Sequence, residues 1–452
     1  MDLLRKVKVE LWVLCLIGFL FLMGIIGFGS LVRHEIVASV SRVPILSGTA
    51  LFLAEIPSNF RAIIRGLSYD LEVQDQRFPS VSGFQGKFLE NESYLLLSKY
   101  DGEKKKPVVE LIDLRSFEVK KTWEPDIDQI NALVDTSLPE FEFLERDHNS
   151  RRYLMNHPIL SDDGGLIFKH NSPLVRIDKN SELVWQNQED IFHHSIEQDH
   201  EGNLWVPTSV YPYQVDNRYV GMEYGNYIDD AITKVSKDGE ILFQKSVTNI
   251  FIENNLKYLL FVILSDRFIQ DPIHLNDIQP VLTDGKYWKR GDIFLSLRNL
   301  SMVILYRPST NKIIWKGVGQ FAAQHDVDIL DDARISIFNN NAKNFYGGDK
   351  VDGNSEVVIY DFKTDSYSKY LNESLKRYDV QTVSGGQSQI LNNGDLFFRE
   401  GLRLLYFSKD GSLEWQYINR AKNGKIYLTG WSRILYSEDD VKRIHEILKT
   451  TH

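Results

Sequence analysis

The stretch "NGDLFFREGLRLLYFSKDGSLEWQY" (393–417) decides the fold class of this chain. It opens on a glycine turn, continues through two short apolar segments, and ends a third segment on the aromatic residue Trp415. Short apolar runs separated by polar turn residues are typical of antiparallel strands joined by tight turns. The stretch therefore predicts a three-stranded β-meander.

Similar meanders occur along most of the chain, at 92–123, 163–187, 201–245, 290–317 and 332–370, two of them with insertions. Each meander closes on an aromatic residue; these are Trp123, Trp185, Phe243, Trp315, Tyr370 and Trp415. Successive meanders without helices between them predict an all-β, six-bladed β-propeller. A two-sheet sandwich is the alternative, but it would not explain an aromatic residue at one register of each repeat.

The N-terminal region predicts a membrane anchor. Leu11 to Val32 is an uncharged run of 22 residues, and a helix of that length would span roughly 33 Å, enough to cross a bilayer core of about 30 Å. Basic residues precede the run, so we expect a single-pass protein of the inner membrane with its soluble domain in the periplasm. A cleaved signal peptide is the alternative.

These features predict a division of the chain into four parts. They are a cytoplasmic N-terminus and transmembrane anchor (1–34), a stalk or collar (35–88), the propeller (89–430) and a C-terminal helix (431–452). In the stalk we expect Pro44 and Pro57 to break the helices. The apolar insert at 246–270 is too short to span a membrane and predicts a helix packed on the propeller.

Composition excludes several function classes. The chain has 452 residues and a net charge of −10, which disfavours a nucleic-acid partner. Its one cysteine, Cys15, lies in the apolar run. We therefore expect neither a disulfide nor thiol chemistry in the soluble part.

Histidines occur at matched positions before strands of different repeats. His194 precedes Gly202 by eight residues, and His325 precedes Ala333 by eight. We take Gly202 and Ala333 to open the innermost strands of their blades, so that the residues before them should converge at the propeller axis. His274 precedes a third such strand after a longer linker. His157 falls one residue short of the same register.

A single histidine of this kind is usually structural, but a matched set predicts a site. Arg298 ends the sequence "LSLR" and shares a strand face with Ser296, so that it either binds an anion or makes a surface salt bridge. Asn276 and Asp277 are candidates to orient His274. Three histidines can bind zinc, but an arginine beside them would repel the ion, so we expect no metal. A histidine nucleophile among cationic donors suits transfer of a phosphoryl or sulfuryl group.

Four segments in sequence order resemble the bacterial arylsulfotransferase family. They are "DPIHLN" (271–276), "SLR" (296–298), an imperfect match at "NKIIWKG" around Trp315, and "QHD" (324–326). The resemblance implies a six-bladed propeller that moves a sulfuryl group from an aryl sulfate ester to a hydroxyl acceptor. It implies no cofactor and no nucleotide sulfate donor.

Carried over by position, the resemblance makes His325 the nucleophile that becomes sulfated. His274 and Arg298 would then hold the sulfuryl oxygens, with Asn276 and Ser296 as further substrate-binding residues. His194 matches the remaining histidine; His193 is the alternative, but the register favours His194. Better-known members are soluble enzymes with a disulfide, whereas this chain predicts an anchor and has no cysteine pair. The acceptor is therefore open: a phenol, a glycan or a lipid-linked hydroxyl.

Two other functions compete with this interpretation. One is a non-catalytic propeller that acts as a binding or assembly module of an envelope polysaccharide pathway. The other is a metal- or quinone-dependent oxidoreductase. Metal analysis separates the last from the others, and incubation with an aryl sulfate donor separates the first two.

Overall fold

The computed structural model describes residues 10–37, 43–67, 71–73, 77–137, 141, 144, 148–216, 227–261, 270–345 and 348–449. The chain divides into two units, one with the two N-terminal helices and one with the strands. The two units are described separately below.

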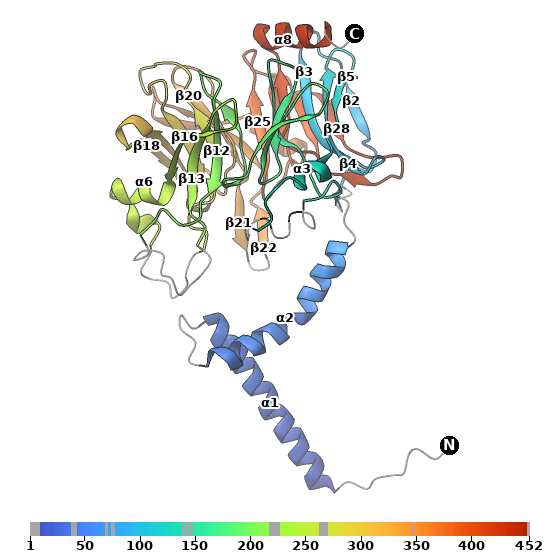
Figure 1. Ribbon diagram of the computed structural model, residues 1–452, viewed down its shortest axis with the longest axis vertical. Coiled ribbons are helices and arrows are strands. Elements are labelled where there is room, and N and C mark those ends of the chain that lie inside the picture. Colours follow the sequence, from blue (N-terminus) through green and yellow to red (C-terminus); the bar gives the residue numbers. More distant parts are fainter. Residues whose placement is uncertain are drawn as a thin grey trace. The chain divides into compact units, whose positions relative to one another are not determined.

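The N-terminal unit contains the helices α1 (Leu11–Val37) and α2 (Pro44–Leu67) (Figure 1). In α1 the segment Leu11–Glu35 is long and apolar enough to cross a membrane, a property that a signal sequence shares. The start of α2 at Pro44, after α1 has ended at Val37, agrees with the expected break at Pro44. The expectation that Pro57 breaks the helix was wrong, because α2 continues through Pro57. Proline suits the first turn, where its missing N–H would have no helical partner, and an interior proline removes only one backbone hydrogen bond.

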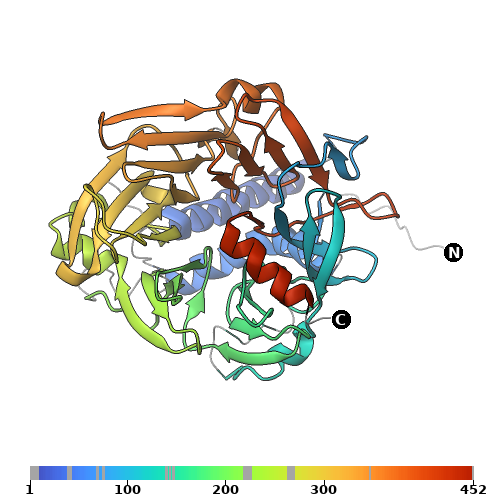
Figure 2. The ribbon, with the colours of Figure 1, turned by 90° about the horizontal axis from the view of Figure 1, so that it is seen from above.

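The second unit is a six-bladed propeller, with its sheets arranged around a central axis (Figure 2). We number the blades in chain order and give their strands from the axis outward. Blades 1 to 3 are: blade 1, β30 (Arg433–Leu435), β3 (Tyr94–Asp101), β4 (Lys106–Asp113) and β5 (Glu118–Trp123); blade 2, β6 (Asn156–Leu160), β7 (Leu166–Lys169), β8 (Leu174–Ile177) and β9 (Leu183–Asn187); blade 3, β10 (Ile191–Phe192) with β11 (Glu197–Gln198), β12 (Leu204–Ser209), β13 (Asp230–Val235) and β14 (Ile241–Ser246).

Blades 4 to 6 are: blade 4, β15 (Leu275–Pro280), β16 (Ile293–Leu297), β17 (Met302–Arg307) and β18 (Lys312–Val318); blade 5, β19 (Val327–Ile329), β20 (Arg334–Asn339), β23 (Glu356–Asp361) and β24 (Ser366–Tyr370); blade 6, β25 (Gln387–Ile390), β26 (Leu396–Arg399), β27 (Leu404–Phe407), β28 (Leu413–Ile418) and the outer β2 (Gly83–Gly86).

The ring closes by pairing its two ends. β30, near the C-terminus, pairs antiparallel with β3, the second strand of the same blade, with Tyr94 opposite Leu435. Blade 1 therefore takes its innermost strand from one end of the propeller and its other strands from the other end. The pairing of β30 with β3 thereby holds the two ends of the propeller together within one blade.

The order of strands within each blade corrects one sequence expectation. Gly202 and Ala333 precede β12 and β20, which are second strands, and the innermost strands β11 and β19 come before them. The glycine turns join the first strand to the second. The innermost strands were missed because they are short and partly polar, so they lack the apolar alternation of the outer strands.

Apolar clusters between neighbouring blades form the core. The closing aromatic residues lie in the fourth strand of each blade, where Trp123 and Trp415 are fully buried. The predicted C-terminal helix is present as α8 (Glu438–Lys449), and its Ile444 and Ile447 pack on blades 1 and 2. In the insert at 246–270, α6 (Val247–Glu253) packs on blades 3 and 4, and residues 262–269 lie outside the described residues.

Shorter elements complete the fold. They are the strand pairs β1 (Glu72–Val73) with β29 (Ile426–Tyr427) and β21 (Ala342–Phe345) with β22 (Gly348–Val351), the helices α3 (Ile127–Asn131) and α7 (Asn372–Arg377), and the 3-10 turns η3 (Lys257–Leu259), η4 (Arg298–Leu300) and η5 (Pro308–Thr310).

Candidate functional site

The structure brings the predicted histidines together at the axis. The ring centroids of His194 and His274 lie 5.0 Å apart, and those of His194 and His325 lie 6.4 Å apart. Trp431, just before β30, has its ring 6.5 Å from His325 and 3.9 Å from His157. Side chains from blades 1 to 5 thus form one continuous group of rings.

An unusual backbone conformation aims several of these rings. His157, His194 and His274 have φ values of 50°, 56° and 54°, a left-handed region that non-glycine residues seldom adopt and that is enriched at functional sites. His274 lies directly before β15, and the pairing register of β15 shifts between Leu275 and Asp277. The strand edge is therefore irregular where these histidines leave it.

Polar side chains beside the histidines connect the innermost parts of blades 3, 4, 5 and 6 in sequence. Ile278 N–H donates to Ser195 Oγ (3.2 Å), Val327 N–H to Asp277 Oδ2 (3.0 Å) and Ser388 N–H to Asp326 Oδ2 (2.9 Å). These bonds fix neighbouring blades relative to one another at the level of the site. They also give Asp277 and Asp326 a structural partner instead of a histidine.

His274 is oriented by Asp271. Its Nδ1 lies 2.5 Å from Asp271 Oδ2, and its backbone N–H donates to Asp271 Oδ1 at 3.0 Å. The carboxylate keeps the proton on Nδ1, which leaves the Nε2 lone pair available. Asn276 donates instead to the Gln324 carbonyl at 2.8 Å. The sequence suggestion that Asn276 or Asp277 orients His274 was therefore wrong.

His325 is buried, and both of its ring nitrogens have partners. Nδ1 donates to Asn340 Oδ1 at 2.6 Å, and Nε2 accepts the Gly385 N–H at 2.8 Å. Burial lowers the pKa of His325 to about 3. The nearby charge of Arg298 lowers it further, whereas the hydrogen bond to Asn340 raises it. The ring is therefore neutral at neutral pH, as a nitrogen nucleophile requires.

His194 is half-buried between its neighbours. Its Nδ1 lies 2.7 Å from Nδ1 of His193, whose Nε2 lies 3.2 Å from Asp230 Oδ1. Burial, followed by the adjacent histidines, lowers the pKa of His194 well below its usual value. Both members of the His193–His194 pair therefore lie at the site. The ring of His194 contacts the rings of His274 and His325.

Arg298 follows the end of β16 and begins η4. Its backbone N–H donates to the His274 carbonyl at 3.0 Å, and its Nη1 donates to Asn299 Oδ1 at 3.0 Å. Among the described residues its guanidinium has no carboxylate partner, so the surface salt bridge is not formed. Ser296 lies fully buried in β16, and no described residue pairs with its hydroxyl.

Two further cations at the site were missed by the sequence analysis. Lys169 and Arg399 are 1% and 8% exposed, and neither has a carboxylate partner among the described residues. Burial lowers the pKa of Lys169 to about 7 and that of Arg399 to about 10. They end β7 and β26, and the repeats "GGLIFK" and "NGDLFFR" already place a basic residue at this shared position.

Negative charge gathers on the innermost strands. Asp328 and Glu197 lie on β19 and β11, and burial, followed by Glu197, raises the pKa of Asp328 to about 7. Arg433 pairs with Glu197 at 2.7 Å and offsets part of this charge. In the described part of the chain no group of three or more His, Cys, Asp or Glu side chains is placed to hold a metal ion.

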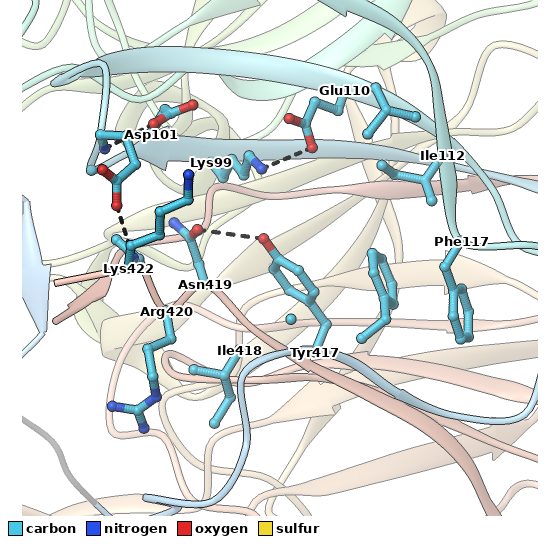
Figure 3. A pocket seen from close by; sticks show the side chains of 16 residues that line it. Lys99, Asp101, Glu110, Ile112, Phe117, Tyr417, Ile418, Asn419, Arg420 and Lys422 are labelled. Atoms are coloured by element: carbon cyan, nitrogen blue, oxygen red, sulfur yellow. Dashed lines mark hydrogen bonds and ion pairs between the residues drawn. The ribbon is translucent and has the colours of Figure 1, made fainter. Parts of the chain in front are cut away.

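A cavity of about 760 Å³ is lined by residues that contact His325. Its lining includes Gly385, whose N–H caps His325, together with Arg399, Trp431 and apolar residues such as Leu402. A second cavity lies between blades 1 and 6 (Figure 3). Its Lys99 is paired with Glu110 at 2.8 Å, whereas Gly385 and Trp431 of the first cavity contact His325, so we place the site at the first cavity.

The fold and this geometry define a class: a six-bladed propeller with a cationic, histidine-lined site on its axis. Among known families, the arylsulfotransferase (ASST) family model matches residues 157–420 of the chain. The chain belongs to the arylsulfotransferase family. A comparison with curated proteins finds no match.

Comparison with solved structures finds distant likenesses. A protein of unknown function from Bacteroides caccae is 12% identical, with 75% of this chain and 98% of that chain covered and a TM-score of 0.46. A streptogramin B lyase is 12% identical, with 81% and 96% covered and a TM-score of 0.38. The WD40 β-propeller domain of Doa1 is 12% identical, with 80% and 96% covered and a TM-score of 0.37. With TM-scores this low, these likenesses add nothing to the argument.

Proposed function

We propose that this protein transfers a sulfuryl group from an aryl sulfate ester to a hydroxyl acceptor through a sulfohistidine at His325. The observation that carries the proposal is the convergence of His194, His274 and His325 on the axis, beside Arg298. Buried charges in proteins are normally paired, whereas Lys169 and Arg399 have no carboxylate partner among the described residues. Such a site favours an anionic ligand, and the family supplies the kind of reaction.

In the first half-reaction the His325 Nε2 lone pair attacks the sulfur of the donor. The N–S bond forms, the S–O bond to the aryl group breaks, and the aryl oxide leaves with the electron pair. The aryl oxide then takes up a proton from solvent. In the second half-reaction the acceptor oxygen attacks the sulfur, the N–S bond breaks, and His274 takes the acceptor proton.

Attack requires the Gly385 N–H to leave His325 Nε2. Gly385 and the following Gly386 have φ values of 68° and 104°, which glycine adopts without strain. Once the sulfuryl group occupies Nε2, the freed N–H is available as a donor to one of its oxygens. A backbone donor at that point would stabilise the charge that develops in transfer.

Arg298 and His274 have complementary roles in this scheme. The planar guanidinium of Arg298 can donate two parallel N–H groups to the sulfuryl oxygens. Asp271 keeps His274 in one tautomer, so that its free Nε2 can take the acceptor proton. Asn276 and Ser296 are buried, and we assign them a supporting position behind these groups.

We place the reaction outside the cytoplasm, with α1 as an inner-membrane anchor. The hydroxyl acceptor, phenolic or on a glycan, would then be an envelope component. This follows from the basic residues before α1 and from its apolar length.

A non-catalytic binding module of an envelope polysaccharide pathway is the second candidate. One observation favours it: both nitrogens of His325 already have hydrogen-bond partners. Such a module would bind a sulfated or otherwise anionic ligand at the same cations without breaking a bond.

Turnover of a chromogenic aryl sulfate by the full-length protein separates the two candidates. We expect phenol release with a phenolic acceptor present, its loss in His325→Ala, and wild-type release in His200→Ala, which changes an exposed histidine on the β11–β12 turn. Absence of release from the folded wild-type protein, across phenolic and glycan acceptors, would support the binding module instead.

A further inference from the structure

Arg399 is a buried cation that has no carboxylate partner among the described residues. Its Nη2 donates to the Thr429 carbonyl at 2.6 Å, and its Nε and Nη1 have no hydrogen-bond partner among the described residues. Its guanidinium lies 6.0 Å from the ring centroid of Trp431. A cation–π contact of this kind offsets only part of the cost of burying the charge.

A nearby arginine shows how the same blade treats a structural charge. Arg403, on the loop between β26 and β27, is also buried, but its Nε donates to Glu400 and its Nη2 donates to the Tyr378 carbonyl at 2.8 Å. Arg433 likewise pairs with Glu197 at 2.7 Å. Arg399 therefore differs from Arg403, the other buried arginine of blade 6, and from the half-buried Arg433.

The position of Arg399 connects it to the nucleophile. It lines the same cavity as Gly385, and its Nη1 lies 4.0 Å from the point that a Cβ atom on Gly385 would occupy. The Gly385 N–H is bonded to His325 Nε2 at 2.8 Å. The free guanidinium nitrogen thus lies on the side to which the His325 lone pair points.

Arg298 and Arg399 approach His325 from two different blades. His325 leads into blade 5, Arg298 belongs to blade 4 and Arg399 to blade 6. Neighbouring contacts between β15 and β19, and between β20 and β25, keep these three blades adjacent. A sulfuryl group on His325 has three outer oxygens, more than one bidentate guanidinium can bind.

We propose that Arg399 is a second anion-binding arginine of this site, which holds sulfuryl oxygens on the blade 6 side of His325 while Arg298 holds them on the blade 4 side. The inference rests on the proposed function for the identity of the anion. Arg399 makes and breaks no covalent bond. It donates N–H groups to the sulfate ester, to the sulfohistidine and to the sulfated product in turn.

The test measures anion binding and turnover separately, on the full-length protein in detergent. Binding of inorganic sulfate is measured by how far it stabilises the protein against thermal unfolding. Turnover is measured with a chromogenic aryl sulfate. We expect Arg399→Gln to weaken sulfate binding roughly tenfold or more, the effect of one charge-assisted hydrogen bond. Arg399→Lys should keep part of the sulfate binding but lower kcat by roughly 10²-fold, because lysine lacks the planar fork.

Arg403→Lys is the matched control, because it changes a buried arginine of the same blade that already has a carboxylate partner. It should lower the unfolding temperature without changing the dependence on sulfate. If Arg399→Gln does not fold, Arg399→Lys alone decides the matter. Wild-type sulfate affinity and wild-type kcat in a folded Arg399 variant would overturn the inference.

The design also distinguishes this inference from the proposed function. If the wild-type protein binds sulfate through Arg399 but transfers no sulfuryl group, Arg399 is an anion-binding residue and the proposed function fails. If the wild-type protein transfers sulfuryl groups and the Arg399 variants do so equally well, the proposed function stands and the role of Arg399 fails.

Discussion

Lys169→Met should stabilise the protein against thermal unfolding and lower its turnover of an aryl sulfate. Lys169 is 1% exposed, has no carboxylate partner among the described residues, and donates from Nζ to the His194 carbonyl at 2.5 Å. Burial lowers its pKa from 10.5 to about 7. Methionine has a similar length and no charge, so it should occupy the same space without the cost of desolvating an ammonium group.

The size of the effect follows from the pKa. At about 1.36 kcal/mol per pH unit, the burial of Lys169 costs roughly 4 kcal/mol at pH 7. Methionine leaves the His194 carbonyl without its donor, which costs about 1–3 kcal/mol. The net gain is roughly 1–3 kcal/mol, or a rise in Tm of the order of 2–5 °C for a domain of this size.

The gain should depend on pH in a defined direction. Because the folded pKa lies below the unfolded one, the unfolded wild-type protein binds more protons than the folded protein between pH 7 and pH 10.5. The stability of the wild type therefore rises with pH in that window. The advantage of Lys169→Met should be greatest below pH 7 and should shrink as the pH approaches 9.

Thermal unfolding of the full-length protein at pH 6, 7, 8 and 9 measures this effect, and aryl sulfate turnover measures the loss of a cation from the site. Lys312→Met, at an exposed position at the start of β18, is the control and should change neither quantity. The reasoning is refuted if Lys169→Met destabilises the protein at every pH, or if its effect on Tm does not vary with pH.

Three other predictions follow from the site and the anchor. Arg298→Lys should lower kcat for an aryl sulfate by roughly 10²–10³-fold, because lysine keeps the charge but not the planar fork; wild-type turnover would assign Arg298 to the surface. Since burial holds the pKa of His325 near 3, the single burst of phenol released without an acceptor should not fall as the pH drops from about 7.5 to about 5, and a loss of that burst centred near pH 6.5 would contradict a neutral buried nucleophile. A reporter fused after His452 should be active only outside the cytoplasm, and activity of a cytoplasmic reporter at that point would reverse the assigned orientation.

The blade count could be predicted from the sequence because the outer three strands of each blade carry strong local signals. Glycine turns, apolar alternation and a closing aromatic such as Trp415 depend on neighbouring residues only. The innermost strands carry no such signal. β11 has two residues and β19 has three, and their hydrogen-bond partners come from the next strand and the neighbouring blade.

The site was partly predictable for a related reason. The equal spacing of His194 and His325 before their turns reflects a real register, and it predicted their convergence. The orientation of His274 by Asp271 depends on an irregular turn before β15, which spacing alone does not reveal. Lys169 and Arg399 were visible as basic residues ending apolar strands, but only the structure shows that no carboxylate neutralises them.

The central claim is a covalent sulfohistidine at His325, and the most direct measurement is mass spectrometry of the protein after brief exposure to an aryl sulfate without acceptor. Because the adduct is acid-labile, digestion should be kept at neutral or basic pH. The account predicts one added sulfuryl group on the peptide that contains His325, released when a phenol is supplied, and absent in His325→Ala. An adduct that maps to another residue, or turnover by His325→Ala at the wild-type rate, would contradict it.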